Sequence, residues 1–217
     1  MRIAIIITAR PSYAKVQTVI AALLKRGVDV QIICAASALL ERYGRVVDVI
    51  RKDYPDVQIT ECWSTYEGAN LITSAKETGA LLVELASRLR DMQCSDVLVV
   101  ADRHEVLAAA QSASYLHLRL WHLQGGERTG SIDDKVRDSI SQLADVHLVA
   151  TARAKHRVYG LTGDWAHIHH VGCPSIDVAK QALSEPPVTA DELGGAGKPV
   201  NLDYPFQSGN VESTQQF

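Results

Sequence analysis

The sequence alternates short apolar runs, rich in β-branched residues, with longer segments whose apolar residues recur at helical spacing. The first run covers residues 3–8, and the first helical segment covers residues 13–26. The apolar residues that share one face of this segment are Val16, Val19, Ile20, Leu23 and Leu24. Apolar strands between helices are typical of a parallel sheet that is covered on both faces. The alternation therefore predicts an α/β fold, a Rossmann-like, doubly wound parallel sheet of about seven strands.

The same pattern sets the expected elements. The predicted strands are residues 3–8, 28–35, 57–62, 97–101, 119–123, 146–150 and 168–171. The predicted helices are residues 13–26, 39–52 with a break at Gly44, 75–91, 105–116, 133–143, 152–159 and 176–183. Residues 184–217 are rich in proline and glycine, with few apolar runs. We therefore expect one domain over residues 1–183, then a linker and a loose tail, with no second domain in this chain.

Composition excludes several kinds of partner. Lys and Arg total 22 against 25 Asp and Glu, a net charge of −3, which is not the footprint of a nucleic-acid-binding protein. No apolar run approaches the roughly 20 residues that span a bilayer. The first apolar run stops at Thr8 without the features of a secretory signal. The four cysteines are far apart, which favours free thiols in a reducing compartment, so we expect a cytoplasmic protein.

Ligands of such sheets bind at the carboxyl ends of the strands, so we expect functional residues in the loops after the first, fourth and fifth strands. The first of these loops contains Arg10 just before a helix, but it lacks the glycines of a dinucleotide-binding loop. Arg10 is placed to donate two hydrogen bonds to a phosphate or carboxylate at the helix N-terminus. An arginine that only caps its own loop remains an alternative.

The loop after the fourth strand begins with Asp102 and Arg103, followed by two more ionisable residues. A helix N-cap would account for Asp102 alone but not for the whole cluster. After the fifth strand, residues 122–137 are dense in glycine and carboxylates, and Asp133 and Arg137 share one helical face. A capped helix with a surface ion pair is the simpler explanation of that segment. Together the two clusters favour a functional site.

The segment His167, His169 and His170 is similar to a metal-binding tract. No cysteine or carboxylate nearby completes a set of ligands for it. We therefore predict that the site contains no metal and no cofactor.

The clusters together resemble the hydrolysing UDP-N-acetylglucosamine 2-epimerases, in particular their sialic-acid-type branch. The motifs that carry the resemblance are Asp102-Arg103, His122-Leu-Gln-Gly-Gly-Glu127, Gly130-Ser-Ile-Asp133-Asp134, Arg137 and Gly172-Cys-Pro174-Ser-Ile-Asp177. Arg10 and Tyr13 match the first-loop arginine of the family and the tyrosine of that branch. The resemblance covers about residues 1–183, and it is specific because the motifs occur together in order and spacing.

The resemblance implies a fold of two Rossmann-like domains facing each other, the glycosyltransferase-B arrangement, of which this chain would be the N-terminal half. It implies conversion of UDP-N-acetylglucosamine and water to N-acetylmannosamine and UDP, for sialic-acid-type or surface-polysaccharide sugar synthesis. UDP leaves by elimination to a 2-acetamidoglucal, which is then hydrated. Neither a metal nor another cofactor is implied, and full-length relatives are commonly homodimers.

The resemblance also assigns residues by position. Those it places in catalysis are Asp102, Asp133, Gln124 and Glu127. Those it places at the substrate are Arg10, Tyr13, Arg103, His122, Gly125, Gly126 and Arg137. Carboxylates suit this chemistry because positive charge builds at the anomeric carbon and a proton must be moved at carbon 2.

The chain departs from the family in two places within these motifs. Gln124 stands where the family usually has Glu, and an amide is no general base at neutral pH. We hypothesise that Gln124 instead hydrogen-bonds the sugar. Asp138 stands where many relatives have His. Two alternatives follow: a non-catalytic remnant that binds a nucleotide sugar, and the acceptor domain of a glycosyltransferase of the same architecture.

Overall fold

The computed structural model describes residues 1–66 and 70–184, which form seven strands and seven α-helices. The strands are β1 (Arg2–Ile7), β2 (Asp29–Ala35), β3 (Gln58–Cys62), β4 (Asp96–Val100), β5 (Arg119–Leu123), β6 (Val146–Val149) and β7 (Ile168–His170). The helices are α1 (Arg10–Lys25), α2 (Val46–Asp53), α3 (Leu71–Asp91), α4 (His104–Tyr115), α5 (Asp133–Leu143), α6 (Ala152–Thr162) and α7 (Pro174–Ser184), with two short 3₁₀ helices, η1 (Ala36–Leu39) and η2 (Glu41–Tyr43).

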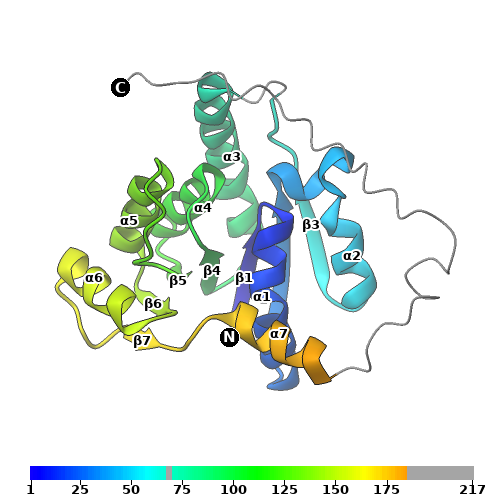
Figure 1. The fold of residues 1–217 in the computed structure, drawn as a ribbon. Coiled ribbons are helices and arrows are strands. Elements are labelled where there is room, and N and C mark those ends of the chain that lie inside the picture. The colour runs from blue at the N-terminus through cyan, green and yellow to red at the C-terminus, as the bar shows by residue number, and fades with distance from the viewer. Residues whose placement is uncertain (67–69, 185–217) are drawn as a thin grey trace, which may run out of the picture. The chain divides into compact units, whose positions relative to one another are not determined.

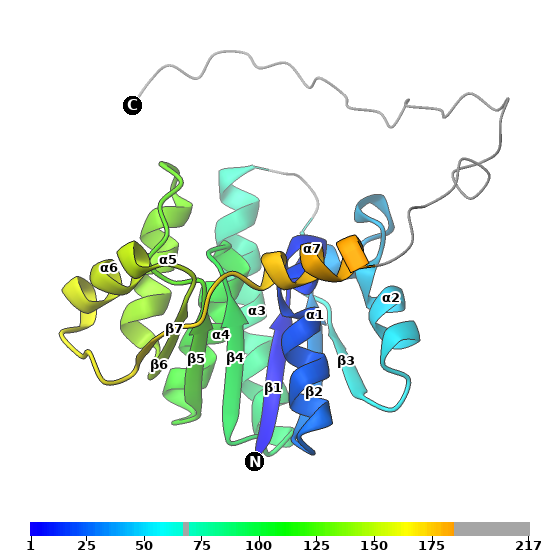
Figure 2. The same ribbon diagram turned by 60° about the horizontal axis from the view of Figure 1, so that its bottom comes forward.

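All seven strands pair in parallel, in the order β3-β2-β1-β4-β5-β6-β7 (Figures 1 and 2). Ile3 of β1 pairs with Val30 on one side and with Asp96 on the other. The strand order therefore reverses between β1 and β4. This reversal is the place where doubly wound sheets open a crevice at the carboxyl ends of their strands. The predicted α/β fold is confirmed.

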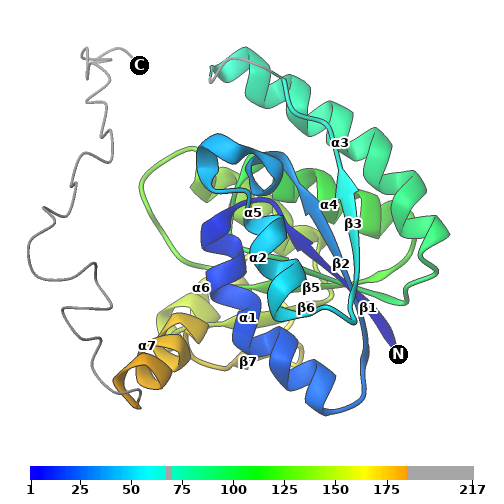
Figure 3. The same ribbon diagram turned by 90° about the vertical axis from the view of Figure 1, so that its right-hand side faces the viewer.

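Helices cover both faces of the sheet. One core packs α3, α4 and α5 against the sheet, and the other packs α1 and α2 against the opposite face (Figure 3). Alternate residues of β1 belong to different cores, since Ala4 and Ile6 face the first and Ile5 and Ile7 face the second. Burial on both faces explains why β1 reads as a continuous apolar run.

Two element boundaries differ from the sequence prediction by four residues or more, each for a local reason. Helix α3 begins at Leu71, four residues before the predicted start, because Asn70 caps it. The Asn70 side chain accepts hydrogen bonds from the backbone N–H groups of Ile72 and Thr73, each at 3.0 Å. The predicted helix over residues 39–52 is wrong in its first half, which forms two 3₁₀ turns ending at Gly44, with φ of 78°.

The described chain forms a compact unit from Met1 to Lys180. Residues 185–217, predicted to be a linker and tail, lie outside the described residues. Within residues 1–66 and 70–184, no helix combines the length and the apolar character needed to cross a membrane.

The core against α3 gives a direct test of the fold. Leu85 of α3 is fully buried, whereas Val83 on the same helix is 71% exposed. Leu85→Ala should lower the free energy of unfolding by about 2–5 kcal/mol, because it removes buried methyl groups and leaves a cavity. Val83→Ala should change it by less than about 0.5 kcal/mol. Urea unfolding followed by circular dichroism measures both, and equal losses would show that α3 does not pack as described.

Candidate active site

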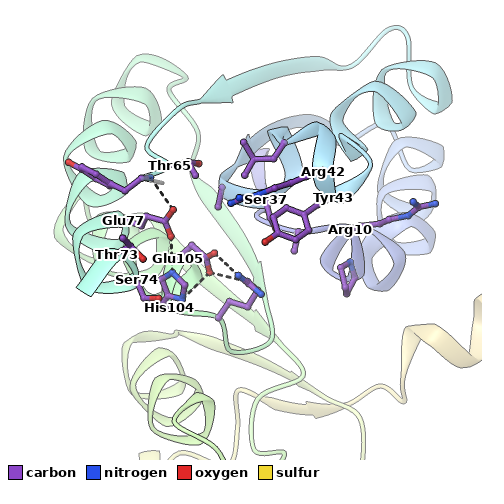
Figure 4. A pocket seen from close by; sticks show the side chains of 16 residues that line it. Arg10, Ser37, Arg42, Tyr43, Thr65, Thr73, Ser74, Glu77, His104 and Glu105 are labelled. Atoms are coloured by element: carbon purple, nitrogen blue, oxygen red, sulfur yellow. Dashed lines mark hydrogen bonds and ion pairs between the residues drawn. The ribbon is translucent and has the colours of Figure 1, made fainter. Parts of the chain in front are cut away.

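A cavity of about 380 Å³ lies at the carboxyl edge of the sheet, beside the reversal between β1 and β4. Loops after β1, β2, β3 and β4 and the first turns of α3 line it. Figure 4 shows Arg10, Arg42 and Tyr43 on one side and Glu77 and His104 on the other. The hydroxyl-bearing lining residues are Ser37, Tyr43, Thr65, Tyr66, Thr73 and Ser74. Arginines together with hydroxyl groups suit a polar, anionic ligand such as a phosphate ester.

Two of the predicted site residues, Arg10 and Arg103, line this cavity. Arg103 donates to both oxygens of Glu105, over 3.0 and 2.8 Å, and the Glu105 side chain is 2% exposed. These hydrogen bonds to Glu105 raise the pKa of Arg103. A buried carboxylate thus fixes the direction of an exposed guanidinium at the cavity wall.

His104 lies between two carboxylates in the same wall. Its Nε2 is 3.4 Å from Glu77 and its Nδ1 is 3.5 Å from Glu105. The donor atoms of these three residues lie within 4.8 Å of one another. Because Arg103 already occupies both oxygens of Glu105, the cluster fits a metal ion poorly. In the other tract, His167 Nδ1 lies 2.5 Å from Asp164, and His170 Nε2 lies 3.1 Å from the Ala150 carbonyl oxygen. The metal-free site stays a prediction.

One buried arginine, Arg137, binds groups of the loops after β4 and β5, among them the predicted carboxylate of Asp102. The Arg137 side chain is 3% exposed, and its Nη2 donates to Asp102. Its Nη1 donates to Asp134 and to the Glu127 carbonyl oxygen, both over 2.6 Å. Arg137 is predicted to hold the substrate, but each of these contacts is internal. The Arg137 guanidinium joins the loop after β4 to the loop after β5. Its contact with the substrate stays a prediction.

Asp133 sits on α5 one turn before Arg137, and its Oδ2 accepts a hydrogen bond from the Ser131 hydroxyl over 2.9 Å. The charge of Asp133 also contributes to the raised pKa of Arg103, the residue after Asp102. Asp102 and Asp133 therefore lie at the same edge of the sheet, beside the cavity rather than within its lining. Glu127, predicted as a further catalytic acid, is half-buried next to them, and its described contact is through its backbone oxygen.

The structure buries His122 fully, and its predicted contact with the substrate stays a prediction. Its Nε2 lies 2.8 Å from the Ala101 carbonyl oxygen and its Nδ1 lies 3.0 Å from the Ser141 hydroxyl. A carbonyl only accepts, so Nε2 carries the proton and Nδ1 accepts from Ser141. Burial lowers the pKa of His122 to about 4. His122 therefore holds the end of β4 and helix α5 to β5 as a neutral ring.

Gly125 and Gly126, also predicted to lie against the substrate, are buried by neighbouring helices. A Cβ at Gly125 would lie 2.9 Å from the Ser141 hydroxyl oxygen. At Gly126, where φ is 79°, a Cβ would overlap the Ala154 carbonyl oxygen of α6. Close packing of α5 and α6 against this loop therefore accounts for both glycines, and contact with substrate stays a prediction.

Gln124 is 3% exposed and has a φ of 66°, a left-handed conformation that non-glycine residues seldom adopt. Ala101, at the end of the neighbouring strand, has a φ of 65°. Side-chain Nε2 of Gln124 donates to the sulfur of Cys173 over 3.2 Å, and within the part of the chain that the structure describes its Oε1 has no hydrogen-bond partner. Strained residues at adjacent strand ends are typical of functional sites. The contact with Cys173 is one that the sequence patterns did not reveal.

Tyr13 is not among the residues that line the cavity, and its predicted contact with the substrate stays a prediction. Its ring is 6% exposed within the core beneath α1 and α2, and its hydroxyl donates to Asp53 of α2. Burial and the neighbouring carboxylate raise the pKa of the hydroxyl. In this structure Tyr13 joins two helices and does not line the cavity.

A family model for UDP-N-acetylglucosamine 2-epimerase matches residues 21–194. The chain belongs to this epimerase family. A UDP-N-acetylglucosamine 2-epimerase of Neisseria meningitidis is 31% identical over 183 residues, 82% of this chain and 46% of the relative. A hydrolysing UDP-N,N'-diacetylbacillosamine 2-epimerase of Legionella pneumophila is 32% identical over 157 residues, 71% of this chain and 41% of the relative. The chain spans about half the length of the relatives that it matches.

Solved structures agree with the family fold. The structure of UDP-GlcNAc 2-epimerase from Methanocaldococcus jannaschii matches with a TM-score of 0.72 and 22% identity, over 84% of this chain and 48% of that one. A structure from Listeria monocytogenes, named as a putative UDP-N-acetylglucosamine 2-epimerase, matches with a TM-score of 0.75 and 20% identity, over 87% of this chain and 49% of that one. The likeness confirms the Rossmann-like fold of glycosyltransferase-B type for this epimerase-family chain.

The buried His122 ring predicts a pH dependence of stability. The unfolded chain binds a proton at His122 below about pH 6.5, whereas the folded chain binds it only below about pH 4. Stability should therefore be constant above pH 6.5 and fall as the pH drops from 6.5 to 4, by about 3 kcal/mol for this group. Urea unfolding at several pH values measures the fall, and the Cε1 proton shift of His122 reports its ionisation. Titration of the folded His122 near pH 6.5 would contradict the argument.

The two loop glycines predict a difference between matched variants. Gly126 and Gly130 both have positive φ, 79° and 82°, but a Cβ at Gly130 would meet nothing within 4 Å. Both changes to Ala add left-handed strain of about 1 kcal/mol, and Gly126→Ala also forces apart the loop and α6. Gly126→Ala should therefore lower the melting temperature clearly further than Gly130→Ala. Equal melting temperatures would mean that α6 does not pack on Gly126.

Proposed function

We propose that this epimerase-family chain provides the sugar-processing half of a hydrolysing 2-epimerase. The reaction converts UDP-N-acetylglucosamine and water to N-acetylmannosamine and UDP. The observation that carries the proposal is the placing of Asp102 and Asp133 at one edge, next to a cavity with arginine and hydroxyl lining. The Neisseria relative is named as a UDP-N-acetylglucosamine 2-epimerase, and the Legionella relative as a hydrolysing 2-epimerase of UDP-N,N'-diacetylbacillosamine.

The contacts of the two carboxylates suggest different roles for them. Asp102 accepts a hydrogen bond from the buried guanidinium of Arg137, which fixes the position of its carboxylate. A fixed negative charge there stabilises the positive charge that builds on the pyranose ring as the bond to the leaving diphosphate breaks. Asp133 accepts a hydrogen bond from the neutral Ser131 hydroxyl, and a carboxylate of this kind is suited to act as a general base. We assign Asp133 to removal of the proton from carbon 2.

The proposed reaction has two steps. In the first, the carbon 2 proton passes to Asp133 and the carbon–oxygen bond at carbon 1 breaks, which releases UDP and leaves a 2-acetamidoglucal. In the second, a hydroxyl from water adds at carbon 1 and a proton adds to carbon 2 from the opposite face. Arg10 and Arg103 are suited to the diphosphate, since both line the cavity. The proposal includes a cytoplasmic setting, sialic-acid-type sugar synthesis and a homodimer for the full-length protein.

A second candidate is a protein that binds a nucleotide sugar without turning it over. Gln124 favours it, because a neutral amide stands where the family usually has an acid. A glycosyltransferase acceptor domain is a weaker alternative. It rests on a fold match to MurG of Acinetobacter baumannii, with a TM-score of 0.53 and 13% identity.

Proton NMR of this chain with UDP-N-acetylglucosamine in D₂O tests the proposal. We expect free N-acetylmannosamine with deuterium at carbon 2, because the proton added in the second step comes from solvent. Asp133→Asn should lower the rate by about 10²–10⁴-fold, the usual contribution of a general base. The control Asp164→Asn should leave the rate unchanged, because Asp164 pairs with His167 at the opposite end of the strands.

The outcomes separate the candidates. Binding of the nucleotide sugar without release of UDP would overturn the catalytic proposal and favour the binding-only alternative. Transfer of the sugar to an added acceptor, without free N-acetylmannosamine, would favour the glycosyltransferase.

A further inference from the structure

The cavity lining contains two carboxylates, and neither of them pairs with Arg42, which also lines the cavity. Both oxygens of Glu105 are occupied by Arg103. Oε1 of Glu77 accepts the backbone N–H of Tyr66 over 3.1 Å. Figure 4 shows Arg42 across the cavity from both carboxylates. Within residues 1–66 and 70–184, no carboxylate forms an ion pair with Arg42, so an anion can bind it without displacing an internal partner.

A second cation without a carboxylate partner lies on the same wall. Arg10 begins α1 and lines the cavity, and within the described part of the chain it forms no ion pair. Its Nη1 lies 3.0 Å from the place that a Cβ at Gly44 would occupy, so the guanidinium packs against the turn η2. Arg42 belongs to that turn. A solvated surface arginine needs no partner, but two unmatched cations at one cavity wall create a positive potential that attracts an anion.

The turn η2 holds the Arg42 side chain in a defined place. The backbone N–H groups of Tyr43 and Arg45 both donate to the Leu40 carbonyl oxygen over 3.0 Å. The guanidinium carbon of Arg42 lies 5.0 Å from the centroid of the Tyr43 ring, within the range of a cation–π contact. Stacking uses the flat face of a guanidinium and leaves the N–H groups at its edge free to donate. The ring of Tyr43 thus orients Arg42 while its donors remain available to a ligand.

We infer that Arg42 is a further substrate-binding residue, whose guanidinium donates to the oxygens of the diphosphate of a bound nucleotide sugar. Tyr43 is a positioning residue that acts through Arg42. Arg10, which packs on the same turn, contacts the same diphosphate, so Arg42 adds a third cation to Arg10 and Arg103. The identity of the ligand as a nucleotide sugar rests on the proposed function, whereas the affinity for a diphosphate rests on the cavity alone.

Titration with inorganic pyrophosphate, followed in ¹H–¹⁵N spectra, tests the contact with the diphosphate. The Nε–H signal of Arg42 is assigned as the one that disappears in Arg42→Lys, and it should shift as pyrophosphate binds. Arg42→Ala should weaken binding about 10- to 100-fold, the effect of losing hydrogen bonds from a charged donor. Arg42→Lys should recover only part of this loss, because an ammonium keeps the charge but not the two parallel donors.

Arg26→Ala is the matched control, because it removes an equal charge at the opposite end of α1 from the cavity. It should bind pyrophosphate as the wild type does, and matched melting temperatures show that the variants are folded. Equal affinity of Arg42→Ala and the wild type would overturn the inference. An equal loss of affinity in Arg26→Ala would also overturn it, because the effect would then come from net charge alone.

The role of Tyr43 is tested in the same titration. Tyr43→Phe keeps the ring and should bind nearly as the wild type does, whereas Tyr43→Ala should weaken binding about two- to fivefold. In an Arg42→Ala background, Tyr43→Ala should cause no further loss, because the ring acts through the guanidinium. An equal further loss in the double variant would overturn the positioning role.

An assay of N-acetylmannosamine release separates this inference from the proposed function. If the wild-type chain turns over UDP-N-acetylglucosamine, Arg42→Ala should raise KM for it. An unchanged KM would overturn the contact of Arg42 with the substrate and leave the proposed function intact. If the wild-type chain binds pyrophosphate through Arg42 but releases no N-acetylmannosamine, the proposed function fails and the diphosphate contact stands.

Discussion

A buried guanidinium is tolerated only when its charge and its N–H groups are matched, and Arg137 meets this condition with acceptors from three segments. Asp102 belongs to the loop after β4, the Glu127 carbonyl to the loop after β5, and Asp134 to the first turn of α5. A shared cation thereby fixes two neighbouring loops in one geometry. The contact of Arg137 with Asp134 also fixes the position of Asp133, because Asp133 directly precedes Asp134 on α5.

The sequence could predict the elements whose apolar residues recur with the period of a strand or a helix. Residues 119–123 and 133–143 form β5 and α5 with the bounds that their apolar patterns indicate. Local side-chain and backbone effects explain the failures. Helix α3 starts early because of the Asn70 cap, and α2 starts late because Arg45 adopts a φ of 32° after two 3₁₀ turns. Apolar spacing contains no information on either effect.

The sequence could predict which segments form the site, but not how deeply each side chain in them is buried. Helical spacing places Asp133 and Arg137 on one face of α5. It does not reveal that the Arg137 side chain is buried while Asp133 stays partly exposed. The contacts of Glu77 with His104 and of Gln124 with Cys173 join residues 27 and 49 positions apart. Such contacts depend on how the loops at the sheet edge meet, so no local pattern reveals them.

The cavity and the carboxylates lie side by side but are formed by the ends of different strands. Their separation limits the kind of ligand that could contact both. Arginine and hydroxyl groups lie at the reversal between β1 and β4, whereas Asp102, Asp133 and Gln124 lie at the ends of β4 and β5. Arg103 belongs to both regions, since it lines the cavity and follows Asp102. A ligand that uses both regions needs an anionic part joined to a polar ring. Under the proposed function, the diphosphate and the pyranose of a nucleotide sugar are those two parts, and Arg103 lies near the bond between them.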